Sequence, residues 1–199
     1  MIAHAAGMQS RGLAVRESHH EFKEAWCELD THADNCCVGD NFVTLEHTSH
    51  TVNMTPFHPE YQAIKNVPIV KAATAYVSPI TGETVILVVN QALAVPNQPV
   101  TLLNPNQMRF NGLLVDDVPK FLHQSSTHSI YDSQSDFRIP LKLRGIHSGF
   151  ISHTPSKQEL EDCRWIELTG EAYWDPCSDA FEKNESIVSD REEGFFCPS

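Results

Sequence analysis

The chain has 199 residues, 41% of them hydrophobic, which suffices for one good-sized domain or for a small domain with an appendage. Its formal net charge is -12 at pH 7, which argues against a nucleic-acid-binding surface, because neutralising phosphates requires clustered Lys and Arg. No apolar run approaches the roughly 20 residues of a membrane-spanning helix, so we expect a soluble protein without a membrane partner.

Residues 1–22 have no regular apolar pattern, and we expect an irregular or disordered lead-in there. Met1 to Gly12 has neither the basic start nor the continuous apolar stretch of a secretory signal peptide. The six cysteines are therefore expected to be reduced thiols in an intracellular, cytoplasmic protein.

The first clear element is an apolar strand over residues 25–29 that runs directly into Asp30. The chain then turns through Thr31, His32 and Ala33 into a second apolar step. Burying a carboxylate costs several kcal/mol unless it is hydrogen-bonded or paired. Asp30 is therefore either satisfied by amides of the turn or poised for chemistry.

Residues 41–58 alternate loosely between apolar and polar and are broken by two prolines, which predicts short strands with a loop. The strongest signal is a hairpin with strands over 68–77 and 84–95 and a Pro/Gly turn over 78–83. The continuously apolar Val85 to Val89 predict burial on both faces of the second strand.

Short strands are expected at residues 102–103 and 113–115. Residues 123–136 are rich in Ser, His, Asp and Gln, which indicates a loop or boundary. A strand pair over 139–151, a short helix near 155–161, an edge strand at 165–168 and a solvated acidic tail after residue 176 complete the chain. We therefore predict three segments: the lead-in 1–22, a domain over 23–122, and a β-rich extension with an acidic tail over 123–199.

The run Leu29-Asp30-Thr31-His32-Ala33 resembles the Asp-Thr/Ser-Gly-Ala signature of aspartic proteases, with His32 in the place of glycine. Residues 88–96, which end in Val-Pro, and residues 101–108, with Leu-Leu and Gln-Met, resemble the closing half of the protease of copia-type LTR retrotransposons. The two segments bracket roughly the first two-thirds of the chain, and their order and spacing fit that family.

This resemblance implies a mainly β, retropepsin-like fold: a small closed β-barrel with a strand-rich C-terminal extension. It implies an aspartic endopeptidase that cleaves its own retrotransposon polyprotein with two carboxylates sharing one proton, and that needs no metal or other cofactor. Because the chain carries one such motif, the resemblance implies a homodimer in which Asp30 meets its copy across a twofold axis.

The resemblance also assigns roles to neighbouring residues. Thr31 is expected to hydrogen-bond across the dimer, and the small Ala33 to let the turn pack against its mate. Leu102 and Leu103 are expected to pack behind the catalytic turn as structural residues. The flap that closes over a peptide substrate is expected at the hairpin tip formed by Ser78, Pro79, Ile80, Thr81 and Gly82.

Alternatives remain open at this stage. His32 either alters the pH optimum, because a protonated imidazole would hold the aspartates ionised, or leaves a catalytically inactive domain that serves as a dimerisation or peptide-binding module. Asp30 could also be a strand-end carboxylate that caps its own turn. A structural zinc site is a third possibility, although the spacing of a zinc finger is missing. Its ligands would come from Cys27, His32, Cys36, Cys37, His47, His50 and His58.

Overall fold

The computed structural model describes residues 23–55, 60, 62–95 and 97–196, with side chains described up to residue 189. The predicted lead-in over residues 1–22 lies outside the described residues. Strands make up 45% of the protein and helices 14%, so the prediction of a mainly β protein is confirmed. None of the helices in the described part of the chain is long and apolar enough to cross a membrane.

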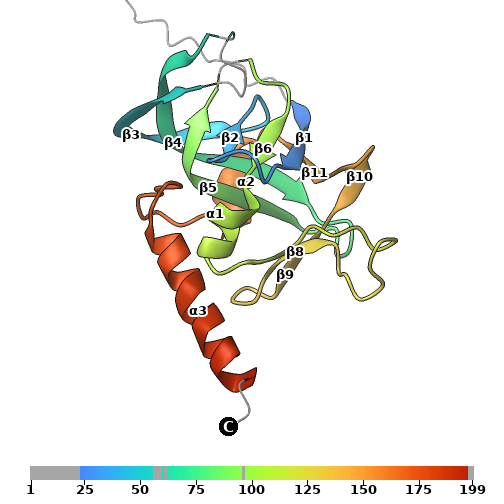
Figure 1. Ribbon diagram of the computed structural model, residues 1–199. Coiled ribbons are helices and arrows are strands. Elements are labelled where there is room, and N and C mark those ends of the chain that lie inside the picture. The colour runs from blue at the N-terminus through green and yellow to red at the C-terminus, as the bar shows by residue number, and fades with distance from the viewer. Residues whose placement is uncertain (1–22, 56–59, 61, 96, 197–199) are drawn as a thin grey trace, which may run out of the picture.

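Twelve strands and three helices follow one another in the described residues (Figure 1). The strands are β1 (Glu24–Leu29), β2 (Cys37–Val38), β3 (Val43–Met54), β4 (Ile64–Val77), β5 (Thr84–Ala94), β6 (Thr101–Leu103), β7 (Leu114–Asp116), β8 (Ser129–Asp132), β9 (Phe137–Pro140), β10 (Lys142–Arg144), β11 (His147–His153) and β12 (Arg164–Glu167). The helices are α1 (Pro105–Phe110), α2 (Lys157–Asp162) and α3 (Ala180–Phe196).

Most strands belong to one sheet of nine strands with the order β10-β11-β1-β6-β2-β5-β4-β3 and with β12 paired to β5. A further pairing of β11 with β4, at His153 and Ala75, joins the two parts of this sheet into a ring. The strands β7, β8 and β9 form a separate antiparallel sheet. Figure 1 shows α3 extending away from the strands.

Strand β5 is the centre of the core. Val85 to Val89 are fully buried, as their continuous apolar pattern predicts. Successive side chains of a strand point to opposite faces, and here Val85, Leu87 and Val89 join the main core cluster while Ile86 and Val88 join a second one. Burial on both faces explains why this strand is apolar at every position.

The predicted boundary near residue 122 does not separate two cores. The main core cluster combines Cys27 and Leu103 with Phe150, Ile166 and Leu168 from the last third of the chain. Strand β11 pairs antiparallel with β1, and β12 pairs parallel with β5. The polar segment 123–136, predicted as a loop or boundary, itself contains β8 and buries Ile130 in the main core, so the chain contributes to one core before and after it.

The last part of the chain departs from the expected solvated tail. Residues 180–196 form α3, a helix of 17 residues, and of its side chains described, up to residue 189, all but Phe181 are exposed. The short helix expected near residues 155–161 is α2, which starts with a capping box between Ser156 and Glu159. The expected edge strand is β12, which lies beside the central strand β5.

Candidate active site

Asp30 directly follows β1, in the turn that leads to β2. Strand β6 lies between these two strands, parallel to β1 and antiparallel to β2. The backbone N–H of Asp30 donates to the carbonyl of Leu103 at 2.9 Å. Leu103 is fully buried and Leu102 is half-buried, so the structure places both leucines beside the Asp30 turn.

Four hydrogen bonds fix the Asp30 turn, by which we mean residues 30–36. Within it, the His32 N–H donates to Oδ1 of Asp30 at 2.9 Å. From outside, the Asn104 side chain donates to the carbonyl of Ala33, and Trp174 Nε1 donates to the carbonyl of Asp34 at 2.8 Å. The Cys36 N–H donates to the side-chain oxygen of Gln107 at 3.0 Å. The turn is thus held from α1 and from the segment before α3.

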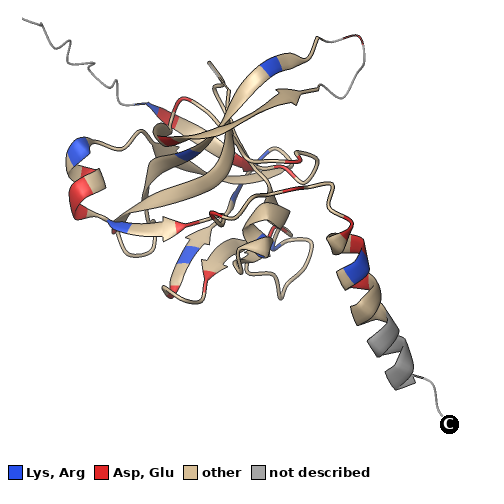
Figure 2. Cartoon of the chain, turned by 90° about the vertical axis from the view of Figure 1, so that its left-hand side faces the viewer, with Lys and Arg blue, Asp and Glu red and all other residues tan. Residues whose placement is uncertain are grey.

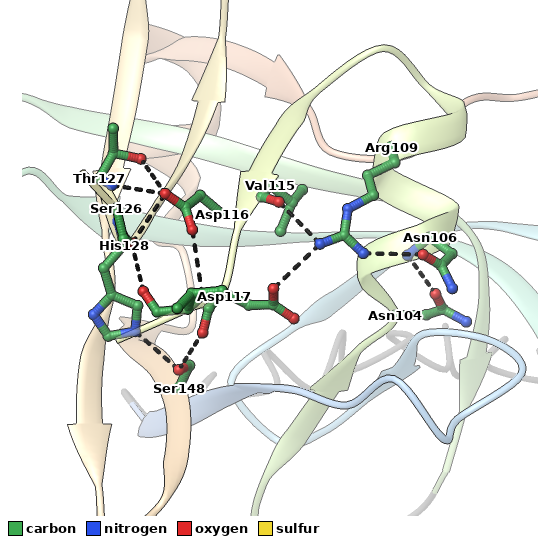
Figure 3. A network of polar contacts seen from close by, with 11 residues as sticks. Asn104, Asn106, Arg109, Val115, Asp116, Asp117, Ser126, Thr127, His128 and Ser148 are labelled. Atoms are coloured by element: carbon green, nitrogen blue, oxygen red, sulfur yellow. Dashed lines mark hydrogen bonds and ion pairs between the residues drawn. The ribbon is translucent and has the colours of Figure 1, made fainter. Parts of the chain in front are cut away.

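The start of α1 gives Asn104 its position. Asn104 is the N-cap residue, whose Oδ1 accepts from the N–H groups of Asn106 at 2.7 Å and Gln107 at 3.1 Å. Pro105 occupies the first helical position, where a missing N–H costs nothing. Figure 3 shows Asn104 and Asn106 at this end of α1, with Arg109 one turn further on.

The Asp30 carboxylate is 31% exposed and opens into a cleft of about 480 Å³. The cleft is bounded on one side by the Asp30 turn and on the other by the end of β3, Val52 to Thr55. The apolar part of the cleft wall is formed by Met54, Leu93 and Leu102. A polar group beside a partly apolar cleft is typical of ligand-binding sites.

His32 does not block this cleft. Its side chain is 97% exposed, and its Nδ1 lies 4.0 Å from Oδ1 of Asp30. Its φ is not positive, unlike that of the five described non-glycine residues with left-handed backbone. The position therefore does not demand glycine, and the N–H that the motif provides is present and bonded to Asp30.

Thr31 is exposed and Ala33 is half-buried. The Thr31 hydroxyl lies 3.5 Å from Nδ1 of His32. Both residues belong to the surface of the Asp30 turn and line a second cleft, which shares Ala33, Asp34 and Pro176 with the first. Thr31, His32 and Ala33 share the turn with Asp30 because they follow it directly in the sequence, and the roles expected of Thr31 and Ala33 across a dimer stay predictions.

The expected flap is not at the site. Residues Ser78 to Gly82 form the turn between β4 and β5, and Pro79 lines a different cavity together with Glu24 and His153. Glu24 is the first residue of β1 and Asp30 follows its last, so this turn lies at the opposite end of β1. Buried Ser78 accepts from the N–H groups of Ile80 and Thr81, at 3.3 Å each, and caps its own turn.

The flap was predicted at this turn because the strands on either side of it give the strongest hairpin pattern in the sequence. β4 and β5 are apolar because they form the core, and their hairpin turn has no part in the cleft. The strand that lines the cleft together with Asp30 is β3. Its residues are mostly exposed, so its sequence gives only a weak periodic pattern. The connection from β3 to β4 includes residues 56–59 and 61, which lie outside the described residues.

The cysteines do not favour a metal site. Burial raises the pKa of Cys27 to about 11 and that of Cys36 to about 12, so both thiols are less acidic than an exposed cysteine. Among the described residues, no group of three or more His, Cys, Asp or Glu side chains could hold a metal ion. His58 and Cys197 lie outside the described residues.

A buried serine–histidine pair also occurs, with Ser148 on β11 and His128 directly before β8. His128 Nε2 lies 2.9 Å from the hydroxyl of Ser148, and that hydroxyl donates to the carbonyl of Asp117 at 3.2 Å (Figure 3). Because the Ser148 hydroxyl donates to Asp117, it accepts a hydrogen bond from His128 Nε2, and in this arrangement the histidine is a donor to Ser148 and not its base. Burial lowers the pKa of His128. The pair is structural.

The chain matches no protein-family model, no curated protein and no solved structure in our comparisons. Function is therefore inferred from the Asp30 turn and its cleft. Sequence reasoning missed the supporting residues Asn104, Gln107 and Trp174. Asn followed by Pro is a recognisable helix start, with Asn as the N-cap and Pro at the first helical position, so Asn104 could have been found. Nothing local marks Trp174 as a partner of Asp34.

Proposed function

We propose that the protein is a retropepsin-like aspartic endopeptidase, which hydrolyses peptide bonds of a retrotransposon-derived polyprotein through a pair of Asp30 carboxylates in a homodimer. The observation that carries this proposal is the position of Asp30. Asp30 is a half-buried carboxylate that opens into a cleft. Its turn is hydrogen-bonded to β6 through Leu103 and is held by the four hydrogen bonds described above.

The chemistry follows from a pair of such carboxylates. Two carboxyl groups about 3 Å apart cannot both ionise, so they share one proton. One carboxylate takes a proton from a water molecule that attacks the peptide carbonyl carbon, while the other protonates the carbonyl oxygen. The carboxyl group that took the water proton then passes it to the amide nitrogen as the C–N bond breaks, and the other takes a proton back from a hydroxyl of the intermediate, so the pair again shares one proton. The His32 N–H holds one oxygen of Asp30 and so fixes the orientation of the carboxylate for this step.

The topology supports the retropepsin-like form of the proposal. The ring of paired strands, with β6 between the two strands that flank Asp30, agrees with a small barrel in which Leu102 and Leu103 stand behind the catalytic turn. In this proposal the substrate lies along the end of β3, Val52 to Thr55, and not under the turn between β4 and β5.

A second candidate keeps the fold without the activity. His32 Nδ1 lies 4.0 Å from Oδ1 of Asp30, and a protonated ring there would favour ionised carboxylates over a pair that shares a proton. In that case the domain binds a peptide or its own copy and does not cleave.

Cleavage of a peptide library between about pH 4 and pH 7 separates the two candidates. The purified chain is compared with Asp30→Asn and with the control Asp40→Asn. Asp40 is an exposed acid outside the cleft, and its Oδ2 lies 3.2 Å from Nζ of Lys23. We expect cleavage by the natural chain and by Asp40→Asn, and a loss of at least about 100-fold in Asp30→Asn. If all three are folded and equally inert, the binding module is the better description.

A further inference from the structure

A third cleft, of about 620 Å³, lies on the small sheet of β7, β8 and β9 and shares no lining residue with the cleft of Asp30. Successive residues of a strand point to opposite faces of a sheet. One cross-strand row of this sheet packs in or against the main core, and it consists of Val115, Ile130 and Ile139. The neighbouring row lines the cleft, and it consists of Leu114, Tyr131 and Arg138. We call this cleft the Arg138 cleft.

Part of the wall of the Arg138 cleft is apolar. Leu113, Leu114 and Val115 line it where the chain passes from α1 into β7. Leu113 is buried, whereas Leu114 is 63% exposed. The cleft therefore offers an apolar surface that remains open to solvent on one side.

Arg138 is held in a fixed orientation beside this surface. Its guanidinium carbon lies 4.3 Å from the centre of the Tyr131 ring, and its Nη1 donates to the hydroxyl of buried Ser129 at 2.6 Å. In the described part of the chain no carboxylate forms an ion pair with Arg138, so the remaining N–H groups of its fork are left for a ligand. A fork of this kind binds a carboxylate through two parallel hydrogen bonds.

Arg109, the other cation of the cleft, is already paired. Its Nη2 lies 3.3 Å from Oδ1 of Asp117 and also donates to the carbonyl of Val115 at 2.9 Å (Figure 3). Elsewhere Figure 2 shows Lys and Arg scattered singly over the chain, and acidic residues outnumber them by 26 to 14. The cleft is therefore suited to a ligand with one negative charge and not to a polyanion.

The acids near the cleft have other partners. Asp116 lines the cleft, but its Oδ2 accepts from the Ser126 hydroxyl at 3.0 Å and from the Thr127 N–H at 2.6 Å, as Figure 3 shows. Asp136 accepts from the hydroxyl of Tyr131 at 2.9 Å. Neither acid forms an ion pair with Arg138, which leaves its charge for a ligand.

We propose that the Arg138 cleft binds the free C-terminus of a peptide whose last side chain is apolar. The terminal carboxylate pairs with Arg138, and the side chain lies on Leu113 and Leu114. Because the cleft is open beside Leu114, the peptide that precedes the terminus can leave into solvent, whereas the alkyl chain of a fatty acid would need an enclosed cavity. The inference does not rest on the proposed function, since the two clefts share no residue.

The test is a titration of the isotope-labelled full chain with acetyl-Ala-Leu and with the C-terminal amide of the same dipeptide, followed by NMR. We expect saturable shifts at Leu113 to Val115 and at Tyr131 with the acid, and binding of the amide weaker by at least about tenfold. Arg138→Gln should weaken binding of the acid to the same extent. Its matched control is Arg144→Gln, which changes an exposed arginine of β10 outside this cleft and should bind as the natural chain does.

A second variant tests the apolar wall without touching Arg138. Leu114→Asn changes an exposed side chain, so it should keep the fold and weaken binding of acetyl-Ala-Leu by about fivefold. Thermal unfolding followed by circular dichroism checks that each variant is folded.

Several results would overturn the inference. Equal binding of the acid and the amide, or unchanged binding by Arg138→Gln, would mean that no carboxylate pairs with Arg138. Acetate that binds as tightly as the dipeptide would remove the apolar side chain from the site, and octanoate that binds more tightly would replace the peptide by a fatty acid. Absence of shifts up to about 20 mM dipeptide would exclude the site altogether. Peptide cleavage is measured separately through Asp30→Asn, so either conclusion can fail without the other.

Discussion

Asn104 donates a hydrogen bond from its side-chain amide to the backbone carbonyl of Ala33. The other end of the same amide, Oδ1, accepts from the N–H groups of Asn106 and Gln107 at the start of α1. One side chain therefore caps a helix and holds the turn that carries Asp30. Changes at Asn104 should affect both the stability of the protein and the geometry of the candidate site.

Asn104→Ala is expected to lower the free energy of unfolding by about 1–3 kcal/mol, from a lost N-cap and a lost hydrogen bond to Ala33. Asn104→Asp keeps the cap but has no donor for Ala33, so it should lie between the natural chain and Asn104→Ala. Urea unfolding measures these differences. The control Asn106→Ala removes only an exposed bond to Arg109 and should cost less than about 0.5 kcal/mol. Equal stability of Asn104→Asp and the natural chain would show that the bond to Ala33 is unimportant.

Local patterns predicted many elements and few of their partners. The apolar run of β5, the capping box of α2 and the strand end at Asp30 are visible in short windows of sequence. The pairing of β1 with β11 joins residues more than 100 positions apart, and no local pattern specifies it. The flap predicted at the turn between β4 and β5 is wrong for the same reason, because a local pattern does not specify which parts of the chain meet. The strong apolar pattern of this hairpin indicates burial in the core, and it does not indicate which cleft the turn lines.

Asp116 predicts an acid-dependent loss of stability. Burial raises the pKa of Asp116, but hydrogen bonds from the Thr127 N–H at 2.6 Å, from Ser126 and from the Thr127 hydroxyl outweigh it and lower the pKa to about 2 (Figure 3). A carboxyl group with a lowered pKa stabilises the fold above its unfolded pKa of 3.8, and this contribution disappears as the pH falls towards 2.

Asp116→Asn should therefore lower the free energy of unfolding by about 1–2 kcal/mol at neutral pH, after allowance for solvent screening. The difference from the natural chain should shrink below about pH 4 and vanish near pH 2. Chemical unfolding at several pH values measures it. Asp117→Asn, which removes an ion pair with Arg109 at 3.3 Å, is the neighbouring control and should cost less than about 1 kcal/mol. A constant difference at all pH values would contradict the assigned network.

The cysteines should react according to their burial. Cys27 and Cys36 are fully buried, and burial raises the pKa of each thiol to about 11 and about 12. Cys177 is exposed. At about pH 8 iodoacetamide should therefore modify Cys177 in the folded protein, and Cys27 and Cys36 only after unfolding, as peptide mass spectrometry can show. Rapid labelling of Cys27 in the folded protein would mean that β1 is not covered by β11.

His32→Gly tests the one departure from the aspartic protease motif. Because φ at His32 is not positive and the ring is 97% exposed, the fold should lose no more than about 1 kcal/mol, the cost of a flexible glycine. A protonated ring 4.0 Å from Asp30 would weaken cleavage at the alkaline side of the pH profile. Its removal should extend activity to higher pH by less than about one pH unit, since an exposed charge is screened by water. The pH dependence of kcat/KM measures this, and an unchanged profile would exclude His32 from the proton chemistry.

The last third of the chain should be indispensable for folding. Strand β1 pairs with β11, and fully buried Cys27 lies 3.2 Å from the hydroxyl of Ser152. Buried Asn41 donates to the same hydroxyl at 2.7 Å, and Ile166 and Leu168 fill the core beside β5. A chain that ends at residue 122 loses these partners, which leaves one edge of β1 unpaired and buried polar groups unsatisfied.

We therefore expect residues 1–122 to show no cooperative thermal transition by circular dichroism. The matched control is a chain that ends at Ser178. It keeps every described strand and loses α3, whose Phe181 ring packs on Phe110 and Trp174. It should unfold cooperatively, at a somewhat lower temperature. Cooperative unfolding of residues 1–122 would instead mean that this segment is a domain by itself, with β11 and β12 as later additions to a sheet that is already stable.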